Sequence, residues 1–235
     1  MGLAKPGAWV AATLETDMNV QARNWTYAGL VIALFGLPAI VTLYNQLVSQ
    51  PNDGAIAIRE LAILALTGIL LWIVTAREKL PLSSIGLRFD RPGRSLLWGV
   101  GLAVALFALL IGILAVYSTM GIKYGEGGKI APSLWVAFLT VIRAGISEEV
   151  FYRGFALERI ESLSGSKWIA AAVTLLVFAG FHYRQGPAGI FIAFAVGAAI
   201  TLFYLWKRDL LAAIIAHFLV DFLPNVLFPL LGAGD

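Results

Sequence analysis

Three short clusters place ionisable side chains inside otherwise apolar segments of this chain. Their members are, in chain order, Glu148, Glu149 and Arg153, then His182, then His217 and Asp221. Both histidines of the sequence are among them. An ionisable group in an apolar helix is costly unless it is paired or faces water. A positioned carboxylate can take a proton from water, and an imidazole can donate to a developing oxyanion, so these six are the candidate catalytic residues.

Helical spacing predicts which of these side chains pair. Glu149 and Arg153 are four residues apart with the acid first, the favourable order for an intrahelical ion pair. His217 and Asp221 are also four residues apart and share a helix face. Glu148 lies about 100° around the helix from Glu149 and is expected to have no local partner. We therefore predict Glu148 as the free carboxylate and the Glu149–Arg153 pair as its positioning element.

Separation along the chain predicts that the clusters meet. Glu148 and His182 are equally far from Gly165, which lies in the polar turn 162–167. If the helices flanking this turn form an antiparallel hairpin, both residues lie about 25 Å from its centre, at about 1.5 Å per residue. They would then face one another, and His217 could reach the same level from its own helix. This convergence favours a reactive site over a polar network that only locks helices together.

The composition indicates that membrane-spanning helices must position these residues. Hydrophobic residues make up 60% of the 235 positions, charged residues make up 13%, and the mean hydropathy is +0.84. Ordinary globular chains have about 45–50% apolar residues and about 25% charged residues. This chain therefore needs lipid as its solvent. The absence of cysteine excludes disulfides, thiolate metal sites and cysteine nucleophiles. We predict an all-α polytopic bundle forming a single integral membrane domain over residues 1–235.

Apolar windows predict about seven spans. They cover residues 25–48, 61–76, 95–120, 168–183, 188–206 and 210–231, with an alternative start of the second at Ala55. The fourth span is a helix that begins near residue 130 and continues past Arg143 into a charged stretch ending near residue 162. Pro38 predicts a kink in the first span that neighbouring helices tolerate. Small residues every fourth position of the sixth span predict close helix packing; they are Gly189, Ala193, Gly197 and Thr201.

The basic residues lie in short connections rather than in one block, which indicates membrane topology and not nucleic-acid binding. With the N-terminus in the cytoplasm, most Lys and Arg residues fall in inner connections, and Arg143 stays within the fourth span. We therefore predict a multi-pass protein of the cell membrane with a cytoplasmic N-terminus. Residues 1–22 contain no apolar run long enough for a signal h-region, so no cleavable signal is expected.

The three clusters resemble the signature of the CAAX-protease and bacteriocin-processing family, the glutamate-type intramembrane proteases that include type II CAAX prenyl endopeptidases. The family pattern is Glu-Glu-x-x-x-Arg, then Phe-x-x-x-His, then His-x-x-x-Asn or Asp. It is matched by Glu148, Glu149 and Arg153, by Phe178 and His182, and by His217 and Asp221. Residues 151–155 and 84–88 are also similar to family segments. The resemblance covers about residues 131–222, the predicted catalytic core.

The resemblance implies an intramembrane endopeptidase that hydrolyses a peptide bond of a membrane-associated protein or peptide, without a cofactor. Glu148 would activate water, and His182 would hold and polarise it. His217 and Asp221 would support the oxyanion. An ionised Asp cannot donate as the Asn of some relatives can, so Asp221 is expected to orient His217.

Other interpretations use the same residues. One divalent metal such as zinc could bind Glu148, His182, His217 and Asp221, although the zinc-protease pattern His-Glu-x-x-His is absent. A proton-coupled transporter could use them as a relay, although the sequence has no convincing internal repeat. An immunity or binding protein could keep the fold without turnover. The sequence leaves the substrate, its prenylation and the oligomeric state open.

Overall fold

The chain folds as an all-α bundle, as its composition predicts. The computed structural model describes residues 8–124 and 132–231, and within these ranges every regular element is helical. The α-helices are α1 Ala8–Val31, α2 Leu37–Leu47, α3 Asp53–Trp72, α4 Pro92–Thr119, α5 Leu134–Arg143, α6 Glu158–Ser164, α7 Lys167–Phe181, α8 Gly186–Lys207, α9 Leu210–Phe222 and α10 Phe228–Leu230. The π-helical segments are η1 Ile32–Gly36, η2 Ile73–Arg77, η4 Ala144–Leu157 and η6 Leu223–Leu227, and the 3₁₀ segments are η3 Leu82–Ile85 and η5 His182–Gln185.

Five helical stretches within the described residues are long and apolar enough to cross a membrane. They are Val20–Leu47, Asp53–Arg77, Pro92–Thr119, Lys167–Lys207 and Leu210–Leu230. The fourth stretch comprises two helices, α7 and α8, which pack against each other and are joined by η5. The unit α5–η4–α6 carries buried charges and is a further long helical element. This arrangement agrees roughly with the predicted count of about seven spans, and the protein is an integral membrane protein.

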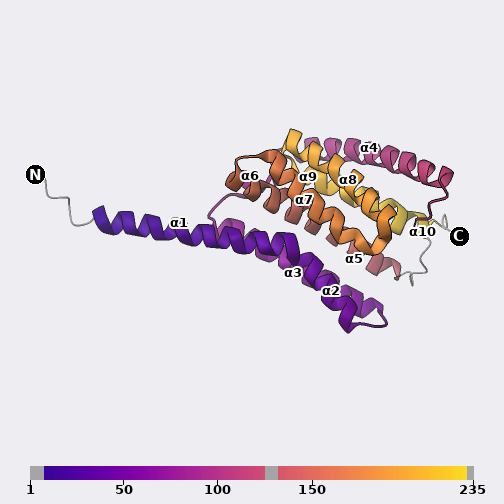
Figure 1. Ribbon diagram of the computed structural model, residues 1–235, viewed down its shortest axis with the longest axis horizontal. Coiled ribbons are helices and arrows are strands. Elements are labelled where there is room, and N and C mark those ends of the chain that lie inside the picture. The colour runs from indigo at the N-terminus through magenta and orange to yellow at the C-terminus, as the bar shows by residue number, and fades with distance from the viewer. Residues whose placement is uncertain (1–7, 125–131, 232–235) are drawn as a thin grey trace, which may run out of the picture.

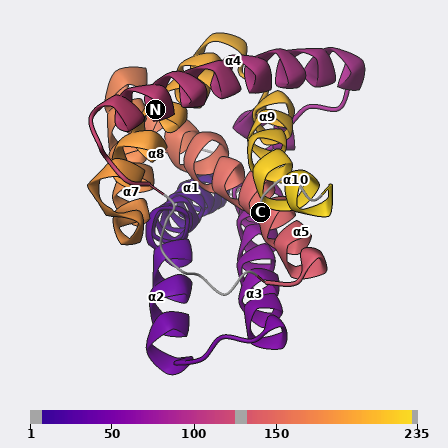
Figure 2. The ribbon, with the colours of Figure 1, turned by 90° about the vertical axis from the view of Figure 1, so that its right-hand side faces the viewer.

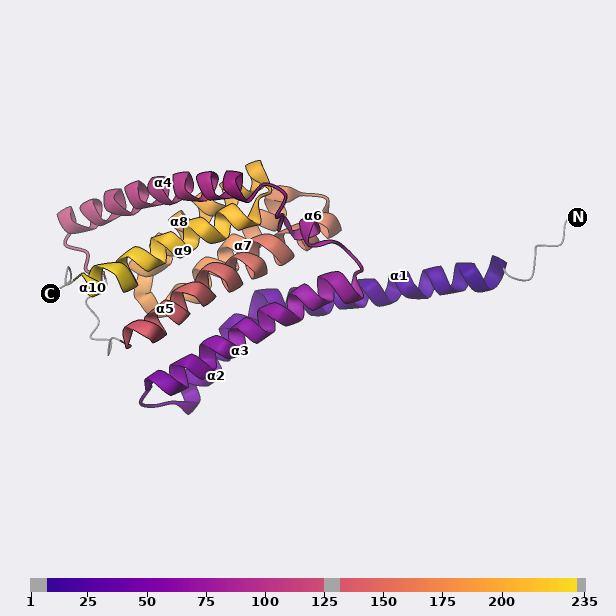
Figure 3. The ribbon, with the colours of Figure 1, turned by 180° about the vertical axis from the view of Figure 1, so that it is seen from behind.

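The π-helical element η4 forms the centre of the bundle. All of its residues except Ile146 are buried. It contacts α9 and α7, and it also contacts α1 and α3. Figures 1 and 3 show α4 and α9 on one side of the α5–α7 layer and α1–α3 on the other. Seen along the bundle, α2 and α3 run side by side and α4 crosses above α9 (Figure 2). The three motif-bearing elements therefore meet in the interior.

Two features of the chain path follow from local sequence. The π-helical segment η1 lies directly before Pro38, whose ring has no N–H to donate within an α-helix. The sequence predicts a kink here, and the helical chain continues through the wider turn of η1 into α2. Gly165 ends α6 in the left-handed conformation at φ 70°, which glycine adopts without steric cost. The chain then reverses, and α6 and α7 pack together as the predicted hairpin.

The second span begins earlier than the predicted window of 61–76 and close to the alternative start at Ala55. Helix α3 starts at Asp53, after Asn52 accepts a hydrogen bond from the backbone of Ala55 as its N-cap. Arg59 and Glu60 therefore lie inside the helix rather than before it, and Glu60 is fully buried. The predicted window of 61–76 places this charged pair just outside the span, whereas in the structure it lies within the helix and Glu60 faces the bundle interior.

Helices α4 and α9 pack closely at Gly99. A Cβ added at Gly99 would lie 2.7 Å from Ile215 Cβ and 2.9 Å from the backbone oxygen of Ala212. At Gly101, two residues along the same helix, a Cβ would meet no atom within 4 Å. Substitutions at these two glycines therefore distinguish the effect of close helix packing from the effect of helix propensity.

Replacing Gly99 with Ala is expected to lower the stability of the folded protein by about 1–3 kcal/mol, because the α9 backbone must move to relieve overpacking. Gly101→Ala is the matched control. It should keep or slightly raise stability, since Ala favours the helix by about 1 kcal/mol over Gly. Thermal unfolding in one detergent, followed by tryptophan fluorescence, measures both. Equal melting temperatures for the two variants would contradict this account of the α4–α9 contact.

Candidate functional site

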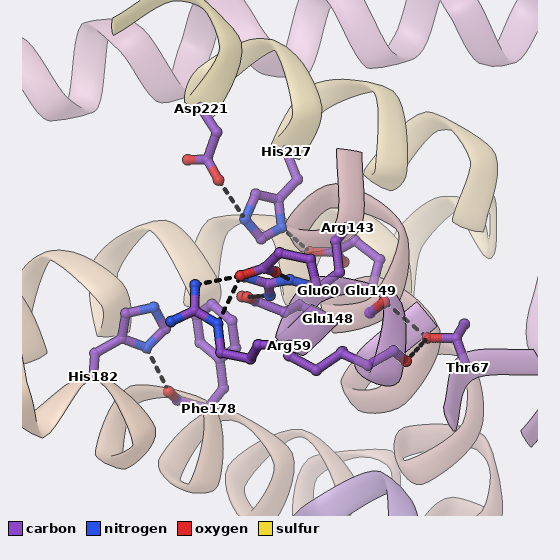
Figure 4. Close-up of polar contacts among 12 residues, drawn as sticks. Arg59, Glu60, Thr67, Arg143, Glu148, Glu149, Phe178, His182, His217 and Asp221 are labelled. Carbon is purple, nitrogen blue, oxygen red and sulfur yellow. Dashed lines mark hydrogen bonds and ion pairs between the residues drawn. The ribbon is translucent and has the colours of Figure 1, made fainter. Parts of the chain in front are cut away.

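The three motifs converge in the bundle interior around the aromatic ring of Phe178 (Figure 4). The ring centroid of Phe178 lies 4.8 Å from that of His182 and 6.5 Å from that of His217. The guanidinium carbon of Arg153 lies 4.4 Å from the same centroid. One residue from each motif therefore touches this ring, as the hairpin argument predicts.

The predicted Glu149–Arg153 ion pair is present. Arg153 Nη1 lies 2.9 Å from Glu149 Oε1, and both side chains are almost fully buried. The same Glu149 oxygen lies 2.7 Å from His217 Nδ1. Glu149 thus joins the first motif to the third, which the sequence analysis did not foresee. Because a carboxylate only accepts, Nδ1 of His217 is the donor in this contact.

Arg153 is anchored on α8 as well. It donates to Thr201 Oγ1 at 3.3 Å and to the backbone oxygen of Gly197 at 3.1 Å. Both acceptors belong to the small-residue stripe that predicts close packing, and the whole stripe is buried. A Cβ at Gly197 would lie 2.9 Å from the Phe178 ring. The stripe therefore brings α8 close enough for its backbone to bind Arg153.

Asp221 is less tightly engaged with His217 than expected. Its Oδ2 lies 3.6 Å from His217 Nε2, beyond the usual hydrogen-bond range. The Asp221 side chain is 33% exposed, against 10% for His217. The closest orienting partner of His217 is therefore Glu149, and Asp221 lies on the open side of the imidazole.

The prediction that Glu148 has no local partner is wrong. Arg143 Nη1 lies 2.8 Å from Glu148 Oε1, and both side chains are buried. Arg143 ends α5 directly before η4, so the two residues are five positions apart across the start of a π-helix. Backbone hydrogen bonds in a π-helix run between residues five apart. The α-helical spacing used for the sequence analysis does not detect this pair.

The pair extends into a buried chain of alternating charges. Arg143 Nε also contacts Glu60 Oε2, and Glu60 Oε1 contacts Arg59. Figure 4 shows this chain running from α3 to Glu148. Glu148 uses Oε1 for Arg143, and among the described residues no hydrogen bond involves its Oε2. Glu60 was missed, although a carboxylate in an apolar helix was the available signal.

His182 has a defined hydrogen-bonding state. Its Nδ1 lies 2.8 Å from the backbone oxygen of Phe178. A carbonyl oxygen only accepts, so Nδ1 carries the proton and Nε2 is the basic nitrogen of the neutral ring. This tautomer leaves Nε2 able to accept a hydrogen bond from water.

Tyr124 lies at the open side of the site, after α4. Its hydroxyl donates to Gln185 Oε1 at 3.3 Å. Burial raises the pKa of Tyr124, and the negative charge of Asp221 adds to this increase. Tyr124 is therefore close enough to Asp221 to interact with it, and no motif in the sequence pointed to it.

The donor set does not gather as a metal site does. Within residues 8–124 and 132–231, no group of three His, Asp or Glu side chains is placed to hold one ion. His217 directs Nδ1 to Glu149, and its Nε2 faces Asp221. The arrangement instead pairs each acidic group with a cation or an imidazole.

The fold and the site define a polytopic membrane protein with a buried carboxylate–histidine cluster. Residues 130–223 match the family described as type II CAAX prenyl endopeptidase Rce1-like. This match confirms the resemblance carried by the three motifs, all of which lie within the matched residues. Neither the search of curated proteins nor the search of solved structures gave a match.

Breaking the buried charge chain is expected to destabilise the fold. Glu60→Gln and Arg143→Gln should each lower the free energy of unfolding by about 3–5 kcal/mol, since each leaves an unpaired buried charge. The double variant should lose less than the sum, because its residues share one interaction. Glu161→Gln, whose carboxylate is 29% exposed beside Arg208, is the control and should cost about 0–1 kcal/mol.

These losses are measured by denaturant unfolding of the four variants in one detergent. Strictly additive effects of the two buried substitutions would show that Glu60 and Arg143 act independently. That result would contradict a continuous chain from α3 to Glu148.

Proposed function

We propose that this protein is a CAAX-protease-like intramembrane endopeptidase that hydrolyses a peptide bond of a membrane-associated protein or peptide. The observation that carries the proposal is the meeting of Glu148, His182 and His217 from three separate helices inside the bundle. The family match over 130–223 implies a membrane peptidase in general. The roles of individual residues below are our proposal.

Glu148 and His182 activate the attacking water. The free Oε2 of Glu148 accepts a proton from water, while Arg143 holds Oε1. Nε2 of His182 accepts a hydrogen bond from the O–H that stays on the same water and fixes its direction. The hydroxide then adds to the peptide carbonyl carbon, and the proton passes from Glu148 to the leaving amine.

His217 and Asp221 support the oxyanion that forms on the carbonyl. An imidazole between two carboxylates can hold a proton on each nitrogen, with Nδ1–H toward Glu149 and Nε2–H available to the oxyanion. Asp221 lies 3.6 Å from Nε2 and balances this charge. Glu149 and Arg153 are positioning residues, because they fix the ring without facing the open side.

Glu148→Gln is expected to abolish hydrolysis, because the amide keeps the shape of the side chain and cannot accept the proton of water. The variant should still fold but at lower stability, since Arg143 loses one of its two carboxylate partners and keeps Glu60. Glu161→Gln, at the exposed hairpin, should keep wild-type turnover. Activity is measured by product mass after incubation of purified protein in liposomes with prenylated and unprenylated peptides. Turnover of Glu148→Gln near the wild-type rate would contradict the assignment.

His217→Ala and Asp221→Asn separate the metal-free mechanism from the metal alternative. Loss of an oxyanion donor costs about 10²–10³ in rate, so His217→Ala should be far less active than Asp221→Asn. The metal-free proposal also expects substoichiometric zinc by elemental analysis and full activity after exhaustive chelation. Equal inactivity of both variants, with loss of one tightly bound divalent ion per chain, would favour the metal-dependent peptidase.

The same assay addresses the non-enzymatic alternatives. A proton-coupled transporter or an immunity protein would give no peptide product with any substrate tested. We propose that the protein acts in the cell membrane with its N-terminus in the cytoplasm. Its proposed partners are the lipid bilayer and a membrane-associated substrate.

A further inference from the structure

A cavity of about 370 Å³ lies at the end of the bundle where α8 gives way to α9. It is formed by the connection before α4, the first turns of α4 and the residues 207–209. His182 begins the turn before α8 and Lys207 ends α8, so His182 lies about 30 Å from the cavity along this helix, at about 1.5 Å per residue. His217 lies eight residues after Asp209 along α9, about 12 Å by the same measure, and the cavity lining includes none of the six candidate catalytic residues. The cavity is distinct from the catalytic cluster.

The cavity carries an excess of positive charge. Its lining includes five cations and two carboxylates; the cations are Arg88, Arg91, Arg94, Lys207 and Arg208. Asp209 already accepts from Ser95 Oγ at 2.8 Å and from the backbone of Ala212 at 3.0 Å. Asp90 and Arg91 lie 3.8 Å apart with exposed side chains.

Among the residues that the structure describes, three of these cations have no carboxylate partner. Arg208 is bound by Glu158 and Glu161, each at 2.6 Å. Burial alone would lower the pKa of Arg208, but hydrogen bonds with these two carboxylates raise it overall. In contrast, Arg88, Arg94 and Lys207 form no ion pair within the described part of the chain. These groups remain available to an anion that enters the cavity.

Aromatic rings hold one of these cations in place. The ammonium of Lys207 lies 3.9 Å from the ring centroid of Trp98 and 3.3 Å from that of Trp206. These two indoles pack edge to face with centroids 5.3 Å apart. Tryptophans are enriched at the membrane–water interface, and the start of α4, the end of α8 and the connection to α9 all line the cavity. The cavity therefore lies at the depth of lipid headgroups.

An apolar surface leads away from the cavity along α4. Leu97, Val100 and Val104 lie on one helix face, and their exposed fractions are 76%, 43% and 64%. These side chains begin immediately after Arg94 and continue toward the centre of the span. A molecule with an anionic head and acyl chains can therefore contact the cations and this face together.

We propose that this cavity binds the headgroup of an anionic phospholipid, with the phosphate between Arg88, Arg94 and Lys207 and the acyl chains along α4. Basic pockets between membrane helices recognise such headgroups by charge. The cations supply the attraction for phosphate, and the Trp98–Trp206 pair fixes the position of Lys207. The apolar face of α4 favours a lipid over a free phosphate ester. This inference does not depend on the proposed peptidase activity.

The test uses the full-length protein, purified in detergent and titrated with phosphatidylglycerol or phosphatidylcholine, with bound lipid counted by native mass spectrometry. The wild type is expected to bind one phosphatidylglycerol at least tenfold more tightly than phosphatidylcholine. The double variant R88Q/R94Q should lose about tenfold or more in affinity for phosphatidylglycerol. Arg88 and Arg94 are exposed, so the variant should keep the wild-type melting temperature.

The control R23Q/K79Q removes the same charge at exposed residues outside the cavity, and it should bind phosphatidylglycerol as the wild type does. Equal binding by R88Q/R94Q and the wild type would overturn the proposal. So would equal affinity of the wild type for the two lipids. Saturation by glycerol 3-phosphate at the lipid's own affinity would show a soluble-anion site, and the lipid assignment would then be wrong.

Discussion

Charge pairing in an apolar interior is the constraint on which the rest of this structure depends. Two buried chains cross between helices: Arg59, Glu60, Arg143 and Glu148 form one, and Arg153, Glu149 and His217 form the other. Breaking such a pair leaves an uncompensated buried charge, which is more costly than the absence of the whole pair. The helices are therefore held in position by the groups that form the candidate site, and fold and site share the same interactions.

At one end of each chain lies an atom to which the proposed mechanism gives a chemical role. The first ends at Glu148, which has one oxygen held and one without a partner among the described residues. The second ends at Nε2 of His217, which faces the partly exposed Asp221. His182 belongs to neither chain, and its tautomer is set by its own helix backbone. In the proposed mechanism, the reactive atoms lie at one end of each chain, at Glu148 and His217, and the other members of the chains are structural. The same network would then be both rigid and functional.

The sequence predicted what depends on local spacing and on composition. The all-α membrane fold follows from the apolar composition, and the Gly165 hairpin follows from a polar turn between apolar segments. The Glu149–Arg153 pair was predictable because its spacing of four residues places the two side chains close together on one helical stretch.

The partners of Glu148 and His217 were not predictable in this way. The contact of Glu149 with His217 joins residues distant in sequence, and helical periodicity carries no information about such contacts. Glu60 was overlooked because Arg59 and Glu60 mark the edge of a charge-free window, and the helix extends past that edge. The Arg143–Glu148 contact was overlooked because the chain leaves α-helical geometry between them. The contacts of Glu149 with His217 and of Glu60 with Arg143 are tertiary, whereas the Arg143–Glu148 contact is local to the start of the π-helical segment.

The π-helical geometry of η4 constrains how many residues this segment contains, as well as which residues they are. A wider turn accommodates more residues than the same length of α-helix, so η4 is equivalent to an α-helix with inserted residues. Deletion of one residue between Arg143 and Glu148 would bring these two side chains to a spacing of four without changing either of them. It would also rotate every position before the deletion relative to Glu149 and Arg153. In this segment, homologous chains should tolerate replacement of apolar residues more readily than any change in register.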